Sequence, residues 1–229
     1  MYKAITIIIF STLFSFTAVQ AEEYFSTKLC ETDQYESIQA QRGDTWNRLF
    51  PDPDQRNIVQ RLNRMNTRLK SGMYVAVPPE LETIDIMALS PFPFTISSPG
   101  SKLIVVDLTL LAWGAYDTEG VLLKWGPASG GREWCYDIKE PGKTVMGRFQ
   151  IYDVRGKNCI SKQFPVEKGG APMPYAMFFQ GGYALHGSDE VPGYNASHGC
   201  VRLFNEDAKW LNEEFVGQPG RTKVLVLPY

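Results

Sequence analysis

The pattern of hydrophobic and polar positions predicts a small mixed region near the start of the chain. Residues 35–78 read as a strand, a short helix, a second helix and a closing strand, in which Val75 and Val77 lie on one side. We expect Asp44 to cap the first helix and Asp54 to cap the second, because aspartate accepts hydrogen bonds from the free amides of a helix start.

A different pattern follows, with short apolar runs separated by glycine-containing turns. Residues 102–229 are therefore expected to form a mainly β domain, a sandwich or barrel-like structure with a few short helices. The strand candidates are LIVVDL, LLAWGAY, GVLLKWGPAS, GRFQIYDV, YALHG, CVRLF and TKVLVLPY. One longer helix is predicted from Glu206 to Phe215, with Asn205 as its cap. The fold class of the whole chain is α+β.

Residues 79–101 are rich in proline and serine and show no sustained period, which is typical of a linker between domains. Four apolar residues in this stretch favour packing on the second domain: Ile84, Ile86, Met87 and Leu89.

Residues 1–21 have the features of a secretory signal peptide. Lys3 precedes an apolar run, and Val19 and Ala21 give a small-residue cleavage step before Glu22. The apolar run is shorter than the ~20 residues that a membrane-spanning helix requires. We expect export to the periplasm or cell envelope, with no stable membrane span after cleavage; the alternative is an uncleaved anchor.

The charge balance argues against polyanionic partners. The formal net charge is −2, and no run of lysine and arginine interleaves with aromatic residues. Such a chain has no basic excess to neutralise phosphates, so nucleic acid and anionic membrane surfaces are not expected partners. We also expect no cofactor.

The chain has four cysteines, Cys30, Cys135, Cys159 and Cys200, and four cysteines permit three fully paired connectivities. Disulfides persist outside the cytoplasm. We expect one bridge, from Cys135 to Cys159, which leaves Cys200 free; Cys30 receives no role.

The only two histidines, His186 and His198, lie within fifteen residues of Cys200. A thiol becomes an effective nucleophile when a neighbouring imidazole removes its proton. A single histidine is more often a hydrogen-bonded structural residue. Two histidines beside one cysteine instead predict that Cys200 is a catalytic nucleophile. Gly199 would let a substrate approach the backbone, and the amides around it could stabilise an oxyanion.

A zinc site is the second interpretation of the same residues. His186, His198 and Cys200 could provide three ligands with an open position for water. No fourth ligand or supporting pattern is evident, so we expect no metal. Activity that is insensitive to chelators would exclude the zinc site.

Residues 102–229 resemble the YkuD-type L,D-transpeptidases. The specific match is YALHGSDEVPGYNASHGCVRLFNEDAKWL, with an upstream HG and a downstream SHGCVRL, and IVVDL, PASGG, GRFQI and PMPYAMFF support it. Two departures are the missing proline in Thr144–Gly147 and a loop from His186 to Ser197 that is shorter than in many relatives. Because of both departures, the resemblance leaves open the shape of a lid over the site and the choice of the substrate that accepts the acyl group.

The resemblance implies roles for individual residues. Cys200 would be the acylated nucleophile and His186 its general base, with the Gly187 carbonyl orienting the imidazole. His198 and Ser197 would shape the pocket and the oxyanion site.

Three further residues would bind substrate. Arg202 would brace the motif or meet a substrate carboxylate. Tyr175 and Met173 are candidate pocket walls, and ordinary core packing is the alternative for both.

The resemblance also implies the reaction. Cys200 would attack the carbonyl that joins diaminopimelate to the terminal D-Ala of a peptidoglycan tetrapeptide stem. An amine acceptor would then give a 3-3 cross-link or attach an envelope lipoprotein. With water as acceptor the enzyme would be an L,D-carboxypeptidase, and a third possibility is a non-catalytic protein that binds the cell wall.

Residues 35–78 resemble a LysM module. The matching features are Gly43-Asp44-Thr45, Asn63 after the second helix, and the closing segment Gly72 to Pro78. LysM modules bind glycans that contain N-acetylglucosamine, so the resemblance implies that this region holds the protein on peptidoglycan glycan strands. The alternative is a small α+β spacer, because a fold does not fix a function.

Overall fold

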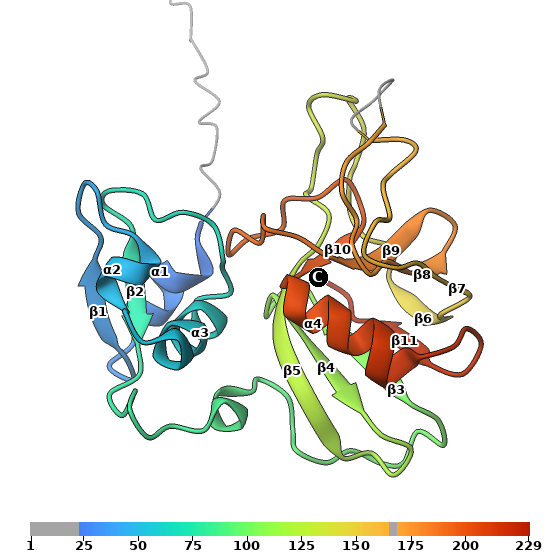
Figure 1. Cartoon of the computed structure of the whole chain (residues 1–229), viewed down its shortest axis with the longest axis horizontal. Helices are drawn as coiled ribbons and strands as arrows, with labels where there is room; N and C mark the ends of the chain where they lie inside the picture. The colour runs from blue at the N-terminus through green and yellow to red at the C-terminus, as the bar shows by residue number, and fades with distance from the viewer. Residues whose placement is uncertain (1–22, 165–168) are drawn as a thin grey trace, which may run out of the picture.

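The computed structural model describes residues 23–164 and 169–229. The predicted signal peptide, residues 1–21, lies outside these ranges. In the described part of the chain, every helix is too short or too polar to cross a membrane. Figure 1 shows a small N-terminal unit, a connector and a larger part built around a sheet.

The N-terminal unit, which ends with β2, contains two strands and three helices. In chain order these are α1 (Phe25–Cys30), β1 (Glu36–Gln39), α2 (Trp46–Leu49), α3 (Pro53–Leu62) and β2 (Tyr74–Val77). β1 and β2 pair antiparallel, with Ser37 opposite Ala76. The predicted order of strand, helix, helix and strand is present, and α1 precedes it as a helix that the pattern did not predict.

Both predicted caps of this unit are wrong by a few residues. Thr45 caps α2 by accepting from the Arg48 amide, because the Asp44 carboxylate instead accepts from the Gln41 amide at 2.7 Å and closes the preceding turn. Asp52 caps α3 and accepts from two amides at 2.9 Å. Proline at the first helical position fixes this start, so Asp54 lies in the first turn, where a negative charge also stabilises the helix.

Asn63 joins the end of α3 to β2. Its side chain is fully buried, donates to the Val59 and Ala76 carbonyls at 2.7 Å each, and accepts from the Ala76 amide at 2.8 Å. A buried amide is stable only when its polar atoms are paired, and here they are. Asn63 therefore has a structural role in holding the helix against the strand.

The larger part has nine strands in one sheet, in the order β6-β11-β3-β4-β5-β10-β9-β8-β7. The strands are β3 (Leu103–Asp107), β4 (Ala112–Tyr116), β5 (Leu122–Ser129), β6 (Gly147–Gln150), β7 (Asp153–Val154), β8 (Met177–Gln180), β9 (Tyr183–Gly187), β10 (Val201–Leu203) and β11 (Lys223–Val226). The predicted mainly β character is confirmed. The segment predicted as one strand, GRFQIYDV, is divided into β6 and β7, and β8 was not predicted.

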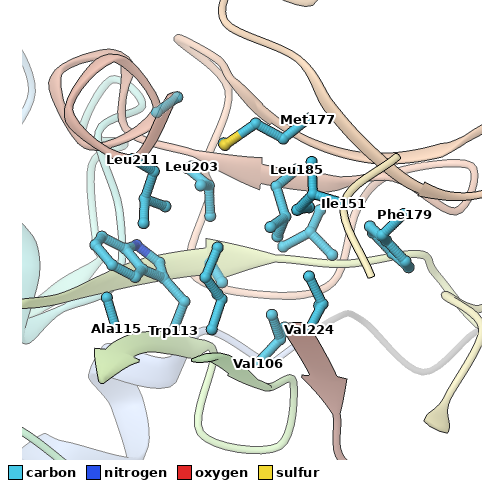
Figure 2. Close-up of a cluster of buried hydrophobic side chains, with 14 of the residues drawn as sticks. Val106, Trp113, Ala115, Ile151, Met177, Phe179, Leu185, Leu203, Leu211 and Val224 are labelled. Carbon is cyan, nitrogen blue, oxygen red and sulfur yellow. The ribbon is translucent and has the colours of Figure 1, made fainter. Parts of the chain in front are cut away.

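The sheet curls so that strands near its two edges meet. Phe149 of β6 and Phe179 of β8 have ring centroids 5.4 Å apart, although six strands separate β6 from β8 in the sheet order. Apolar side chains fill the space enclosed by this curvature, as Figure 2 shows. The members labelled there are Val106, Trp113, Ala115, Ile151, Met177, Phe179, Leu185, Leu203, Leu211 and Val224. Burying one valine, leucine, isoleucine, phenylalanine or methionine side chain contributes about 1.5–3 kcal/mol to the stability of the fold.

The C-terminal helix covers one side of this cluster. It runs as α4 (Asn205–Trp210) and continues as a π-helical segment, η2 (Leu211–Val216). Ala208, Leu211 and Phe215 on one face of this helix are buried, but Asn205 is the first helical residue rather than the predicted cap. The Asn205 side chain instead donates to the Asp189 carboxylate at 2.7 Å.

The connector packs on the sheet, as its apolar residues suggested. It contains one short 3-10 helix, η1 (Ile86–Leu89). Ile86, Met87 and Leu89 contact a second apolar cluster, and the Trp125 indole donates to the Ile86 carbonyl at 2.9 Å.

A buried ion pair joins the N-terminal unit to the sheet. Arg61 of α3 makes two hydrogen bonds of 2.7 Å to the carboxylate of Asp207 in α4, and both residues are buried. Lys124 lies 3.4 Å from the same carboxylate. Gly126 of β5 leaves room for the pair, because a Cβ there would lie 2.3 Å from Asp207 Oδ2.

A second arginine crosses the same interface and is held by a backbone carbonyl and two aromatic rings. Arg64 donates to the Leu110 carbonyl at 3.1 Å, and its guanidinium lies over the rings of Phe25 and Trp125. Burial lowers the pKa of Arg64 to about 9. The N-terminal unit is thus fixed to the sheet by two buried cations.

The loop between β9 and β10 also contacts the N-terminal unit. Asn66 donates to the Ser188 carbonyl at 2.8 Å and accepts from the Val191 amide at 2.9 Å, and the Phe25 amide donates to the Gly193 carbonyl at 2.9 Å. Figure 1 shows this loop extending from the sheet toward the unit. The loop is held at its outer end by residues far away in the sequence.

We predict that Asp207→Asn lowers the free energy of unfolding by about 3 kcal/mol, because it leaves the Arg61 charge buried without its main partner. The control is Glu213→Gln, which removes an exposed pair with Lys209 at 4.0 Å on the same helical segment and should change stability by less than about 0.5 kcal/mol. Urea unfolding measures both. Equal effects of the two substitutions would contradict the importance of the buried pair.

Candidate active site

Cys200 lies directly before β10, at the end of a tight turn. Gly199 has φ 132°, and a Cβ there would lie 2.7 Å from the Tyr183 ring, so only glycine fits. The Cys200 thiol is partly buried and donates to the Gly182 carbonyl at an Sγ–O distance of 3.6 Å. The turn thus presents the sulfur beside the start of β9.

His186 is placed next to this turn by the pairing of β9 with β10. The two strands are parallel, with Leu185 beside Val201 and His186 beside Arg202. Extending this register back by one residue places Cys200 beside Ala184. Ala184 lies two residues before His186 on β9. Residues two apart in a strand point to the same face. In the described residues, no hydrogen bond joins the Cys200 sulfur to either imidazole.

The tautomer of His186 follows from its partner. Nδ1 lies 2.9 Å from the Gly187 carbonyl oxygen, and because a carbonyl only accepts, Nδ1 carries the proton. Burial lowers the pKa of His186 to about 4, so the ring is neutral near pH 7 and its Nε2 has a free lone pair. Gly187 is also sterically required, since a Cβ would lie 2.4 Å from Asn205 Oδ1.

Burial also raises the pKa of the Cys200 thiol, and a backbone hydrogen bond from Ala184 opposes this shift only in part. The resting pair is therefore a neutral thiol and a neutral imidazole. Such a pair can react by transferring the thiol proton to the ring during attack.

His198 points to a different group from His186. Its Nε2 lies 2.7 Å from the Asp137 carboxylate, and its ring stacks on Phe164 with centroids 4.7 Å apart. Hydrogen bonding from His198 lowers the pKa of Asp137. Asp137 was not predicted, because it lies 61 positions from its partner in a segment without a motif.

Ser197 and Thr144 shape the turn that carries Cys200. The Ser197 hydroxyl donates to the Cys200 carbonyl and accepts from the Gly199 amide at 3.0 Å, and the Thr144 hydroxyl donates to the Gly199 carbonyl at 2.7 Å. The Gly199 amide, one of the expected oxyanion donors, is thus paired within the turn. Ser197 organises the turn from inside.

The three expected substrate-binding residues lie in different surroundings. Met173 is buried in a small apolar cluster together with Cys159 and Cys200. Arg202 donates to the Glu190 carbonyl at 3.2 Å, on the loop between β9 and β10. Tyr175, with φ 58°, packs against the main core and lines a shallow pocket with Pro174 and Asn205, which contains none of the other expected site residues.

The expected disulfide between Cys135 and Cys159 is wrong. All four cysteines are free thiols. Cys135 is buried against Gly142, whereas Cys159 packs beside Cys200. Cys135 lies with Asp137 and His198, whereas Cys159 packs with Met173 and Cys200, so the two sulfurs have different neighbours.

The zinc interpretation based on His186, His198 and Cys200 is also not supported by the geometry. Among the described residues, only one group of three potential ligands has all its ligand atoms close together, and it contains neither His186 nor Cys200.

Comparison with known proteins identifies the family of the larger part of the chain. The family model of the YkuD L,D-transpeptidase catalytic domain matches residues 101–226. The solved structure of the L,D-transpeptidase (residues 123–326) from Xylanimonas cellulosilytica is similar, with 27% identity, a TM-score of 0.56, and coverage of 86% of this chain and 98% of that chain.

A second similar structure is the L,D-transpeptidase from Stackebrandtia nassauensis, with 20% identity, a TM-score of 0.50 and coverage of 89% of each chain, a likeness that concerns the fold alone. No curated protein sequence matches the chain. Because the family model covers more than half of the chain, the protein belongs to the YkuD family of L,D-transpeptidase catalytic domains and is a transpeptidase enzyme.

Proposed function

We propose that the protein is an exported peptidoglycan L,D-transpeptidase in which Cys200 is the nucleophile and His186 the general base. The observation that carries this proposal is the parallel pairing of β9 with β10, which brings a free thiol beside a buried neutral imidazole. Peptidoglycan stem peptides are the substrates on which L,D-transpeptidases act, and the periplasm is the compartment that the signal-like residues 1–21 favour.

In the first half-reaction, the Cys200 side chain turns from the Gly182 carbonyl toward His186. Nε2 of His186 takes the thiol proton while sulfur attacks the carbonyl that joins diaminopimelate to D-Ala. The tetrahedral intermediate then collapses, the C–N bond breaks, and the imidazolium returns the proton to the amine of departing D-Ala. A thioester remains on Cys200.

In the second half-reaction, an amine attacks the thioester and gives its proton to His186. A new amide bond forms, the C–S bond breaks, and the thiol is regenerated with the proton from the ring. The diaminopimelate amine of a neighbouring stem yields a 3-3 cross-link, and a lysine of an envelope lipoprotein would yield an attached protein. Water as acceptor would give an L,D-carboxypeptidase.

Groups around Cys200 can stabilise the negative charge that develops on the substrate carbonyl oxygen and can hold the substrate. We assign the Cys200 amide as the oxyanion donor, since the Gly199 amide is paired with Ser197. Arg202 has its guanidinium near the sulfur and mainly contacts Glu190, so it can meet a substrate carboxylate by exchanging that partner. His198, two residues before Cys200, is held by Asp137 and Phe164, and we assign it to the wall of the substrate pocket.

We further propose that residues 35–78 are a LysM module that binds glycan strands. The support is the observed strand, helix, helix and strand order, together with Asn63, which joins α3 to β2. Arg61 and Arg64 fix this unit to the sheet. A glycan strand bound to the unit would therefore lie at a constant position relative to the active site.

Incubation with purified tetrapeptide muropeptides tests the proposed reaction. We expect the wild type to release D-Ala and form dimers, and Cys200→Ala to lose both activities by about a thousandfold or more. His186→Gln should lose about 10²- to 10⁴-fold. The control, Cys30→Ser, changes a cysteine on α1 and should keep full activity.

Mass analysis of the products distinguishes the alternatives. Release of D-Ala without dimers would identify water as the acceptor. Full activity in Cys200→Ala would refute the cysteine mechanism.

The pH dependence of Cys200 alkylation tests the neutral resting pair. Because the thiol pKa is raised and His186 stays neutral above about pH 5, we expect the iodoacetamide rate at Cys200 to rise about tenfold per pH unit between pH 6 and 8. His186→Gln should keep this slope. Peptide mapping measures the rate at Cys200 alone, and a rate that is flat over this range would reveal a thiolate–imidazolium pair instead.

Binding to glycans tests the LysM proposal. The full chain with Cys200→Ala should bind peptidoglycan whose stem peptides have been removed by an amidase, and soluble N-acetylglucosamine oligomers should compete. Maltose oligomers serve as the control sugar. Absence of binding to the stripped glycan would leave residues 35–78 as a spacer.

A further inference from the structure

Three potential metal ligands from distant parts of the sequence meet beside the active site. The ligand atoms of Cys135, Asp137 and His198 all lie within 4.8 Å of one another. Cys135 and Asp137 belong to the segment between β5 and β6, whereas His198 lies two residues before Cys200. None of these three groups removes the proton from Cys200 in the reaction proposed above.

Of the three side chains, that of Cys135 is held in place, whereas those of Asp137 and His198 can change position. Cys135 is fully buried, and its backbone forms an antiparallel bridge with Glu140 through hydrogen bonds of 2.8 and 3.4 Å. Gly142 gives the sulfur its space, since a Cβ there would lie 2.3 Å from it. The Asp137 side chain is 54% exposed and that of His198 is 22% exposed, so both can move without disturbing the core.

The ligand types match a divalent transition metal. Thiolate, imidazole and carboxylate are the ligands that Zn²⁺ takes in proteins, and its catalytic sites often have three protein ligands and one open position. In a tetrahedral zinc site neighbouring ligand atoms are ~3.5 Å apart, as bond lengths of 2.0–2.3 Å require. The 2.7 Å contact of His198 with Asp137 would therefore open by less than ~1 Å.

We propose that Cys135, Asp137 and His198 bind one divalent transition metal ion of the Zn²⁺ type, with water as the fourth ligand. Binding forms three metal–protein bonds and releases the Cys135 thiol proton to solvent, together with any proton held between His198 and Asp137. No electron transfer takes place. The three ligand atoms form or break no bond in the proposed acyl transfer, although His198 is shared with the wall of the proposed pocket.

The metal would clamp two segments of the site together. The segment that carries Cys135 and Asp137 already contacts the catalytic turn, through the Arg132 amide, which donates to the Ser197 carbonyl at 3.0 Å. A metal bond from His198 to this segment would fix the turn more firmly and hold the imidazole in one position. The ion pair of His198 with Asp137 explains two of the three side chains but not the thiol beside them.

Titration of the full chain with Zn²⁺ tests the proposal. We expect one ion per chain by calorimetry, with affinity weakened about tenfold or more in Cys135→Ser, Asp137→Asn and His198→Gln. Co²⁺ should give a sulfur-to-metal charge-transfer band that disappears in Cys135→Ser. The matched controls, Cys159→Ser and Cys200→Ser, should keep both the affinity and the band.

Hydrogen exchange supplies a second measurement, in which amides of residues 132–142 should exchange more slowly when Zn²⁺ is added. Asp137→Asn changes an exposed side chain, so it tests the site even if Cys135→Ser does not fold. The proposal is overturned if Zn²⁺ does not bind, if binding is unchanged in Asp137→Asn, or if it is lost in Cys200→Ser, which would place the ion on the nucleophile.

Discussion

β9 and β10 lie side by side and run in the same direction, with Leu185 beside Val201 and His186 beside Arg202. Parallel neighbours cannot be joined by a tight turn, so the chain must leave the sheet and return. Residues 188–200 make this return, and they end in the glycine turn that presents the Cys200 thiol. The register of this strand pair thus places the turn that carries Cys200 next to the strand that carries His186, the two residues proposed as nucleophile and base.

The same loop makes the N-terminal unit part of the active-site architecture. Its outer end is held by Asn66, and the unit is itself fixed through the buried contact of Arg61 with Asp207. The N-terminal unit therefore holds the loop more firmly than a flexible linker would. The position of the loop depends on a buried ion pair, and a buried ion pair tolerates little displacement. Recognition of the wall and acyl transfer are therefore expected to occur in one fixed geometry.

Local sequence patterns were sufficient for most of the strands and for the family. The HG and SHGC segments carried the resemblance to L,D-transpeptidases that the family model bears out, and the roles of Cys200 and His186 stay predictions. Interactions between distant segments were not predictable in this way. Asp137 meets His198 only through folding, and Cys135 and Cys159 remain free thiols with different neighbours. The caps were misplaced because several polar residues compete at each helix start, and geometry decides among them.

The account depends on Cys200 being the group that becomes acylated with help from His186. Its most direct test is to trap the wild type with a carbapenem, digest it and locate the adduct by peptide mapping. We predict a single adduct on the peptide that contains Cys200, formed much more slowly in His186→Gln. An adduct on Cys135 or Cys159, or one that forms equally fast without His186, would contradict the account.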